Sequence, residues 1–297
     1  MKISPMSSCK SDKMDSQNNM CAIVIPVYKE LTDRYEEHSF RQCLKVLHHY
    51  DVYLVTHEHM PLSSYDIISR EYGITLNRVF FPISYFKGIE GYNNLMMQKQ
   101  FYASFKAYRY ILVYQLDAFV FKDELAYWCN LGYDYIGAPV ESPWFEKCNS
   151  EKDGAVVLRV GNGGFSLRKV DYFLKVLSRR LPLMKTKINS FFKYSELKKI
   201  ANFFGWENTI SYYVNLESKM NEDVFYTVYL QDSYVPPQLP PVETAALFAF
   251  EKSPTYMYDM TGQHMPFGCH AYLKYEYESF WKKHIENNET VNNNHQL

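Results

Sequence analysis

The N-terminal part of the chain alternates between short apolar runs and segments whose apolar residues recur at helical spacing. Residues 21–27 (CAIVIPV) form a continuous, largely β-branched run, which is typical of a strand buried on both faces. Further strands are predicted at 51–56 and 79–82, with helices at 40–49 and 64–72 in the intervals. This alternation predicts an α/β fold with a mostly parallel central sheet flanked by helices.

The same pattern continues with a helix predicted at 92–108 and a strand that begins at Tyr110. Ligands of such sheets bind beyond the carboxyl ends of the strands. Residues that directly follow predicted strands are therefore the first candidates for a functional site. Tyr28, Thr56 and Asp117 occupy these positions.

The second half of the chain has a less regular pattern. Short strands are predicted at 133–138, 156–159 and 163–167, and helices at 169–180 and 224–230. No internal repeat is visible, so the pattern continues to favour one domain.

Composition limits the size and the partners of the protein. A chain of 297 residues with 47% hydrophobic residues suits one large domain. Its 32 basic and 33 acidic residues give a net charge of −1, so we expect no nucleic-acid partner. The six cysteines lack C-x-x-C spacing, which favours a reduced, cytoplasmic protein over a disulfide framework or a zinc site.

No part of the sequence predicts a membrane span, because no run approaches about 18 uninterrupted apolar residues. Residues 1–19 are polar and are predicted to form a flexible arm, and the Asn-rich residues 286–297 a disordered tail. Residues 181–204 combine lysines with apolar residues, which suits peripheral contact with the inner face of a membrane or with a lipid-linked acceptor. A helix that covers the core with a solvated lysine face explains this segment equally well.

The strongest local signal is the run 110–121 (YILVYQLDAFVF), in which Asp117 separates two apolar stretches. Burying a carboxylate there is costly unless a cation or hydrogen-bond donors satisfy it. Mg²⁺ or Mn²⁺ would do so while also holding a diphosphate, since hard cations prefer carboxylate and phosphate oxygens. An aspartate that caps a strand end is the alternative.

Five motifs follow one another in the order found in GT-A glycosyltransferases. They are VIPVY at 24–28, QLD at 115–117, GNGGFSLR at 161–168, NEDVF at 221–225 and PFGCH at 266–270. The chain resembles this class over about residues 21–270. More closely, it is similar to a bacterial family of predicted glycosyltransferases with QLDA, YDYIGAP, GNGGFSLR and EDVF motifs.

The resemblance implies a single GT-A domain over residues 20–285, with a nucleotide-binding half at 20–138 and an acceptor-side half at 139–285. It implies transfer of a sugar from a nucleoside diphosphate sugar to a hydroxyl of a glycan or lipid-linked acceptor, in bacterial surface polysaccharide synthesis. Within the fold, the resemblance implies the following donor-binding residues: Pro26, Tyr28 and Glu30 in the wall of the nucleotide pocket, Thr56 in its floor, and Asn93 and Lys99 near the ribose or diphosphate.

Gln115, Leu116 and Asp117 stand where the resemblance places the D-x-D motif, but the first acid is replaced by Gln115. Asp117 is then the carboxylate ligand expected for Mn²⁺ or Mg²⁺. His270 resembles the late histidine that completes the metal shell in several GT-A enzymes, and a structural or phosphate-binding histidine is an equal alternative.

The glycine-rich loop at 161–164 lets a ligand approach the backbone closely, and no G-K-[ST] follows that would make it a phosphate-binding P-loop. The resemblance places Asn162, Gly163 and Gly164 against the donor sugar and the acceptor. A tight turn between two strands is the competing interpretation.

The predicted catalytic residues are Asp223 and its neighbour Glu222. Acids at a helix start are stabilised by the helix dipole whatever their function, which suffices to explain Glu222. For Asp223 the resemblance implies the base that deprotonates the acceptor hydroxyl in an inverting transfer. A retaining GT-A enzyme and a non-catalytic carbohydrate-binding protein remain alternatives, whereas the absence of G-x-G-x-x-G after the first strand disfavours a Rossmann methyltransferase or dehydrogenase.

Overall fold

The computed structural model describes residues 19–141, 158–179, 183 and 221–286. The predicted arm at 1–19 and tail at 286–297 lie almost entirely outside these residues. The lysine-rich segment 181–204 lies outside them except for Leu183, so its contact with a membrane stays a prediction. No helix of the described residues has both the length and the apolar character needed to cross a bilayer.

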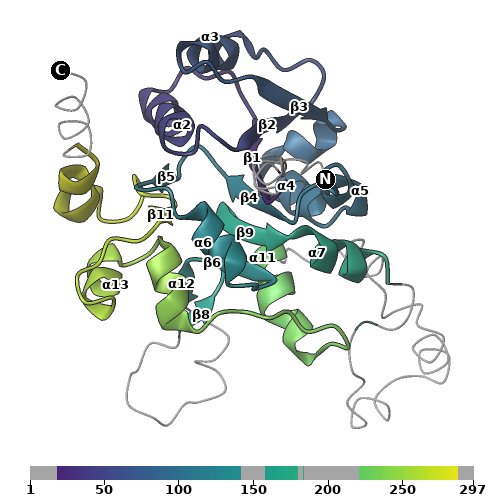
Figure 1. The fold of residues 1–297 in the computed structure, drawn as a ribbon, viewed down its shortest axis with the longest axis vertical. Coiled ribbons are helices and arrows are strands. Elements are labelled where there is room, and N and C mark those ends of the chain that lie inside the picture. The colour runs from purple at the N-terminus through teal and green to yellow at the C-terminus, as the bar shows by residue number, and fades with distance from the viewer. Residues whose placement is uncertain (1–18, 142–157, 180–182, 184–220, 287–297) are drawn as a thin grey trace, which may run out of the picture.

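A six-stranded sheet forms the centre of the domain, in the order β3-β2-β1-β4-β9-β6 (Figure 1). The first four strands run parallel to one another, and β9 is antiparallel to both β4 and β6. The predicted α/β class with a mostly parallel central sheet is confirmed. The strands are β1 (Cys21–Pro26), β2 (Asp51–Thr56), β3 (Leu76–Phe80), β4 (Tyr110–Tyr114), β6 (Tyr135–Gly137) and β9 (Phe165–Lys169).

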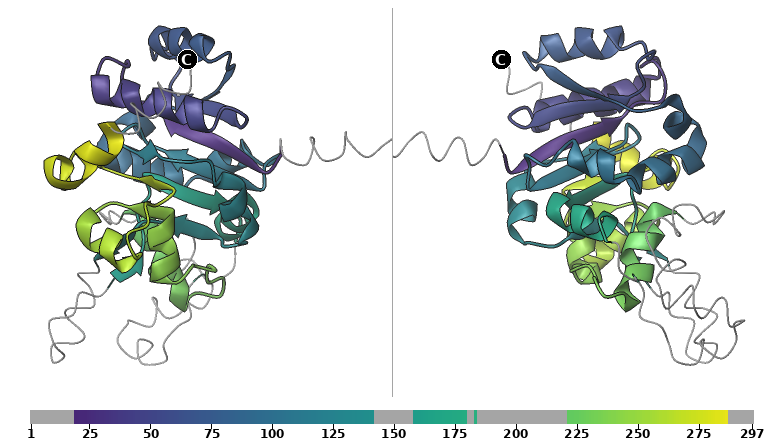
Figure 2. Two further views of the ribbon diagram at one scale, coloured as in Figure 1. Left: turned by 60° about the vertical axis from the view of Figure 1, so that its left-hand side comes forward. Right: turned by 90° about the vertical axis from the view of Figure 1, so that its right-hand side faces the viewer.

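Helices cover both faces of this sheet, as Figures 1 and 2 show. Each face of the sheet has its own apolar core, and successive side chains of β1 belong to one core or the other. Ile23 and Ile25 belong to the first core, and Ala22 and Val24 to the second. All four are fully buried, which explains the continuous apolar run in the sequence. One face is covered by α2 (Arg34–Val46), α3 (Ser63–Glu71) and α6 (Leu125–Asn130), and the other by α4 (Gly88–Met96), α5 (Lys99–Ala103), α7 (Val170–Leu177) and α11 (Glu222–Thr227).

A smaller sheet in the order β10-β11-β5 brings the C-terminal part of the domain to the end of β4. Strand β5 begins two residues after Asp117 and pairs antiparallel with β11, so that Cys269 lies opposite Phe119. His270 is thereby carried to the side of Asp117. The remaining elements are β5 (Phe119–Val120), β7 (Pro139–Glu141), β8 (Leu158–Val160), α12 (Val242–Phe248), β10 (Ala249–Phe250), α13 (Pro254–Met260), β11 (Gly268–Cys269), 3-10 helices at Ile83–Phe86 and Tyr229–Asp232, and a π-helix at Tyr277–Trp281.

Several predicted elements have different bounds in the structure. The helix predicted at 92–108 is two helices, because the chain leaves helical geometry at Gln98 (φ −89°, ψ 129°) between α4 and α5. The helix predicted at 40–49 begins at Arg34, since the side chain of Asp33 accepts hydrogen bonds from two backbone N–H groups of its first turn. The strand predicted at 163–167 begins only at Phe165, after the glycine-rich loop.

Candidate functional site

A cavity of about 220 Å³ lies at the carboxyl ends of β1 and β4. Four residues of the predicted site line it, namely Pro26, Tyr28, Gln115 and Asp117. The ring of Tyr28 is 39% exposed and meets Tyr92 edge-on at 6.5 Å between centroids. The strand ends therefore bring these residues together as predicted from the parallel sheet.

Three other residues predicted for the nucleotide pocket do not line this cavity. Thr56 is fully buried, and its hydroxyl donates to the carbonyl of Val27 at 2.9 Å, which ties the end of β2 to the end of β1. Glu30 is exposed on the loop after β1, and Lys99 is exposed at the start of α5. Thr56 thus acts on the site only through the backbone that it holds.

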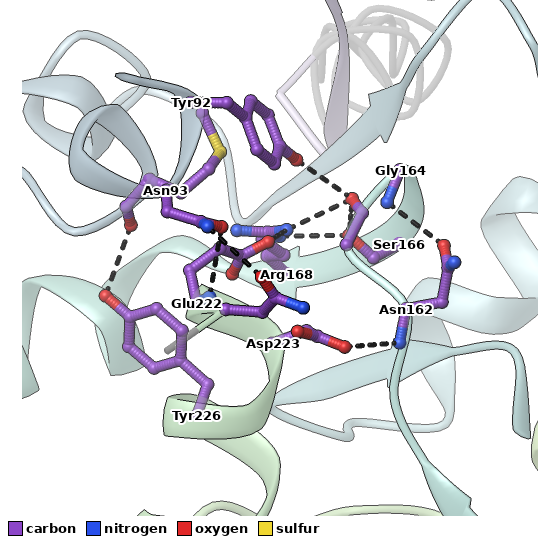
Figure 3. A network of polar contacts seen from close by, with 12 residues as sticks. Tyr92, Asn93, Asn162, Gly164, Ser166, Arg168, Glu222, Asp223 and Tyr226 are labelled. Atoms are coloured by element: carbon purple, nitrogen blue, oxygen red, sulfur yellow. Dashed lines mark hydrogen bonds and ion pairs between the residues drawn. The ribbon is translucent and has the colours of Figure 1, made fainter. Parts of the chain in front are cut away.

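Asn93 joins two helices instead of facing the cavity. Its side-chain oxygen accepts the backbone N–H of Glu222 at 3.2 Å, and its amide group donates to Asn221 at 3.3 Å (Figure 3). One unsatisfied N–H at the start of α11 is thereby bonded. The structure places Asn93 as a cap for the helix that carries Asp223.

Asp117 lies after β4 as predicted, but its carboxylate is not buried. The side chain is 47% exposed, which corrects the expectation of a carboxylate enclosed by apolar residues. Partial burial opposes its ionisation, but His270, whose Nε2 lies 3.1 Å from Oδ1, lowers the pKa of Asp117 below the usual value. Asp117 is therefore a charged group at the edge of the cavity.

His270 stands at the centre of a polar cluster. Its Nε2 also lies 3.2 Å from Oε1 of Gln115, and its Nδ1 lies 3.0 Å from the amide nitrogen of Asn162 and 3.5 Å from Oε1 of Glu251. Burial of the ring disfavours the charged form, but the carboxylates of Asp117 and Glu251 raise the pKa of His270 to about 10. Glu251 follows β10 and was not predicted from the sequence, because no motif marks it.

Each glycine of the loop 161–164 makes room for an ionisable side chain. A methyl group on Gly161 would overlap the guanidinium of Arg159, one on Gly163 would overlap Glu222, and one on Gly164 would overlap His270. The missing Cβ atoms therefore allow close packing of charged groups around the backbone. This finding goes beyond both interpretations offered by the sequence.

Asn162 holds this loop in shape. Its φ of 63° lies in the left-handed region, which Asn tolerates better than most residues. The side-chain oxygen accepts the backbone N–H groups of Gly164 and Phe165, and the hydroxyl of Tyr135 donates to its carbonyl at 2.6 Å. Asn162 is 7% exposed, so most of its polar groups are engaged within the protein.

Asp223 approaches the same loop from α11. Its Oδ2 accepts the backbone N–H of Asn162 at 3.1 Å and lies 3.8 Å from the guanidinium of Arg159, as part of the network that Figure 3 shows. The side chain is 14% exposed. Asp117 and Asp223 are thus connected through His270 and Asn162.

Glu222 is held in a buried ion pair with Arg168 and does not reach solvent. Oε1 lies 2.8 Å from the guanidinium, and the two side chains are 2% and 0% exposed. Burial raises the pKa of Glu222, and Arg168 opposes that rise. Glu222 thus contacts Arg168 and does not line the cavity, and its catalytic role stays a prediction.

Arg168 also bonds the loop itself. Its guanidinium donates to the carbonyl of Gly163 at 3.1 Å and to the hydroxyl of Tyr102 at 3.0 Å, and the hydroxyl of Tyr92 donates to the same carbonyl. The motif GNGGFSLR contained Arg168, but nothing in its spacing distinguished a buried arginine from a surface one. Arg159 was missed for the same reason.

The expected metal centre is not formed by the side chains that the structure describes. Among them, no group of three or more His, Cys, Asp and Glu residues has the arrangement to hold an ion. The two predicted ligands, Asp117 and His270, contact each other through Oδ1 and Nε2, which lie 3.1 Å apart.

The sequence matches the family described as "Protein of unknown function (DUF5672)" over residues 75–270, which is more than half of the chain. The chain belongs to this family. The match includes Asp117, the loop 161–164 and Asp223 and ends at His270, so the DUF5672 region contains the whole polar network. No curated protein matches the sequence.

Several solved structures are similar to the chain at low identity. Core-mannan synthase A (CmsA/Ktr4) from Aspergillus fumigatus, in a form with Mn and GDP, is 8% identical with a TM-score of 0.45, over 77% of this chain and 72% of that one. The glycosyltransferase GlyE from Streptococcus pneumoniae gives 10% identity and a TM-score of 0.42 in its apo form, over 85% of this chain and 54% of GlyE. A second GlyE structure is 15% identical with a TM-score of 0.43, over 86% of this chain and 55% of GlyE. The chain spans about half the length of GlyE, and similarity of this extent carries no conclusion on activity.

Proposed function

We propose that this DUF5672 chain is a glycosyltransferase that moves a sugar from a nucleoside diphosphate sugar to an acceptor hydroxyl. The nucleotide occupies the cavity at the ends of β1 and β4, between Tyr28 and Asp117. The anomeric carbon then lies toward the loop 161–164, with Asp223 on its far side. The connection of Asp117 to Asp223 through His270 and Asn162 is the observation that carries this proposal.

Asp223 serves as the base. Its Oδ2 is held by the N–H of Asn162, while Oδ1 has no hydrogen bond to any described residue and is free to accept a proton. A largely enclosed carboxylate is suited to this task because water competes weakly for it. The nearby guanidinium of Arg159 helps to fix the carboxylate in one orientation.

The transfer is a single displacement. The acceptor oxygen forms a bond to the anomeric carbon, its proton passes to Oδ1 of Asp223, and the bond from that carbon to the diphosphate oxygen breaks. The electron pair of the broken bond leaves with the nucleoside diphosphate. Attack opposite to the leaving group inverts the configuration of the anomeric carbon.

Replacement of Asp223 by Asn tests this assignment, because the amide keeps the shape of the side chain and cannot act as a base. Asp223→Asn is expected to lower kcat at least about 100-fold, the usual contribution of a general base, while leaving the Kd of the nucleoside diphosphate unchanged. The matched control is Asp232→Asn, since Asp232 is an exposed acid in the helical turn that follows α11.

Equal transfer rates for the wild type and Asp223→Asn would remove Asp223 from the mechanism. Retention of configuration in the product, determined by NMR of its anomeric proton, would contradict the single displacement. Glycan binding without transfer from any nucleotide sugar would favour a carbohydrate-binding protein instead.

A further inference from the structure

The cavity at the ends of β1 and β4 is lined by an ion pair that the proposed transfer does not use. Lys29 lies on the loop after β1, and Glu36 lies in the first turn of α2. Nζ of Lys29 is 3.1 Å from Oε1 of Glu36, and the two side chains remain 58% and 26% exposed. Oε2 of Glu36 has no hydrogen bond to any residue that the structure describes. The pair can therefore bind a ligand that enters the cavity.

The position of the pair in the cavity indicates which part of a nucleotide it meets. The proposed function places the sugar toward the loop 161–164, which joins the cavity at Gln115, whose backbone N–H donates to the carbonyl of Gly164 at 2.8 Å. Lys29 and Glu36 belong instead to the segment that connects β1 to α2. Because sugar and nucleobase are opposite ends of a nucleotide sugar, the base lies toward the pair. This step rests on the proposed function.

The surroundings of the pair suit a nucleobase. Val27, Leu116 and Tyr65 line the same cavity and are buried, so they offer apolar surface to the faces of a flat ring. The edge of the ring then meets the charged pair. Since the pair has no net charge, it suits a neutral base better than a diphosphate.

The hydrogen-bonding groups of the pair have a fixed order. An ammonium only donates and an ionised carboxylate only accepts, so the pair presents one donor at Nζ of Lys29 and then two acceptors on Glu36. The complementary edge has one acceptor beside two adjacent N–H groups.

Guanine has this edge, in the order O6, N1–H and the N2 amino group. Uracil has one N–H between two carbonyl oxygens, so a carboxylate that binds it also meets an acceptor. Cytosine and adenine present one amino group beside an acceptor nitrogen. We propose that Lys29 and Glu36 bind the edge of a guanine, and that the nucleotide of this site is therefore guanosine diphosphate.

The test is the binding of nucleoside diphosphates to the full chain, measured by calorimetry. All titrations contain Mn²⁺, so that a requirement for a cation does not decide the outcome. We expect GDP to bind at least about tenfold more tightly than UDP, within the usual discrimination by one bidentate contact to a base. Inosine diphosphate differs from GDP only in lacking the N2 amino group, and it should bind about tenfold more weakly than GDP.

Glu36→Gln assigns this preference to the pair, because its NH₂ group would face an N–H of guanine. We expect the variant to bind GDP about tenfold more weakly, to bind UDP as the wild type does, and to distinguish GDP from inosine diphosphate less well. Glu37→Gln is the matched control. Glu37 is the next residue of α2, pairs with Arg41 at 2.8 Å and does not line the cavity, so both affinities should stay unchanged.

Three results would overturn the proposal: UDP that binds as tightly as GDP, equal affinities for GDP and inosine diphosphate, or a Glu36→Gln variant that weakens GDP and UDP alike. Sugar transfer without preference among nucleobases would overturn base recognition and leave the proposed function intact. Selective binding of GDP without transfer from any guanosine diphosphate sugar would support base recognition and contradict the proposed function. A chain that binds no nucleoside diphosphate would contradict both.

Discussion

The backbone N–H of Asn162 donates to Oδ2 of Asp223 across 3.1 Å, and this contact links the glycine-rich loop to the helix that supplies the proposed base. The side chain of Asn162 makes the corresponding link to His270 on the other side of the loop. A shift of the loop would therefore displace the donor side and the acceptor side together.

Gly163→Ala should destabilise the protein by about 3 kcal/mol, the upper range for overpacking, because the new methyl group overlaps Glu222. Glu222 cannot yield easily, since Arg168 holds it in a buried pair. Urea denaturation measures the loss. Gly73→Ala is the control: its φ of +67° disfavours a side chain, but nothing lies within 4 Å, so about 1 kcal/mol is expected. Equal losses would contradict the steric role of Gly163.

Arg168→Met should cost about 3–5 kcal/mol, because it leaves the carboxylate of Glu222 buried without its partner. The double variant Arg168→Met with Glu222→Leu removes both charges and should recover most of that loss. Chemical denaturation of the two single variants and the double variant gives the coupling energy. Additive losses would show that the two side chains do not stabilise each other.

The contribution of His270 to stability should fall as pH rises. Its pKa is raised from 6.5 to about 10 in the folded protein, so the folded state binds the proton more tightly than the unfolded state. The contribution is fully present below the unfolded value of 6.5 and is lost as pH rises to about 10. The difference in unfolding free energy between the wild type and His270→Gln measures this contribution, because the titrations of groups that are unaffected by the substitution cancel in the difference. A difference independent of pH over this range would exclude the carboxylates of Asp117 and Glu251 as the cause.

Much of the central sheet could be predicted from the sequence, because its strands are buried on both faces. Residues 21–27 and 51–56 read as strands for that reason, and their ends place Tyr28 and Thr56 at one edge. The break between α4 and α5 could not be predicted, since apolar residues continue at helical spacing across Met97 and Gln98. Tertiary packing of the two short helices overrides that local pattern.

Position after a predicted strand pointed only to Tyr28, Thr56 and Asp117, whereas Asn162, Asp223 and His270 were expected from the resemblance alone. The meeting of Asp117 with His270 depends on the pairing of β5 with β11, two strands of two residues each that carry no periodic signal. Successive side chains of a strand point to opposite faces of the sheet, so Arg168 and the apolar Leu167 lie on opposite faces of β9. From the sequence, the face that carries Arg168 would be taken to be exposed to solvent. In the folded chain that side is covered by α5, α7 and α11, which leaves Arg168 fully buried against Glu222.

The most direct test of the proposed function is a crystal structure of the Asp223→Asn variant with an intact nucleoside diphosphate sugar. We predict that the nucleotide lies in the cavity between Tyr28 and Asp117, with the anomeric carbon facing the side chain at position 223. We also predict that a ligand hydroxyl lies within hydrogen-bond distance of Asp117. A nucleotide bound away from this cavity, or a sugar that points away from α11, would contradict the assignment of both acids to one reaction.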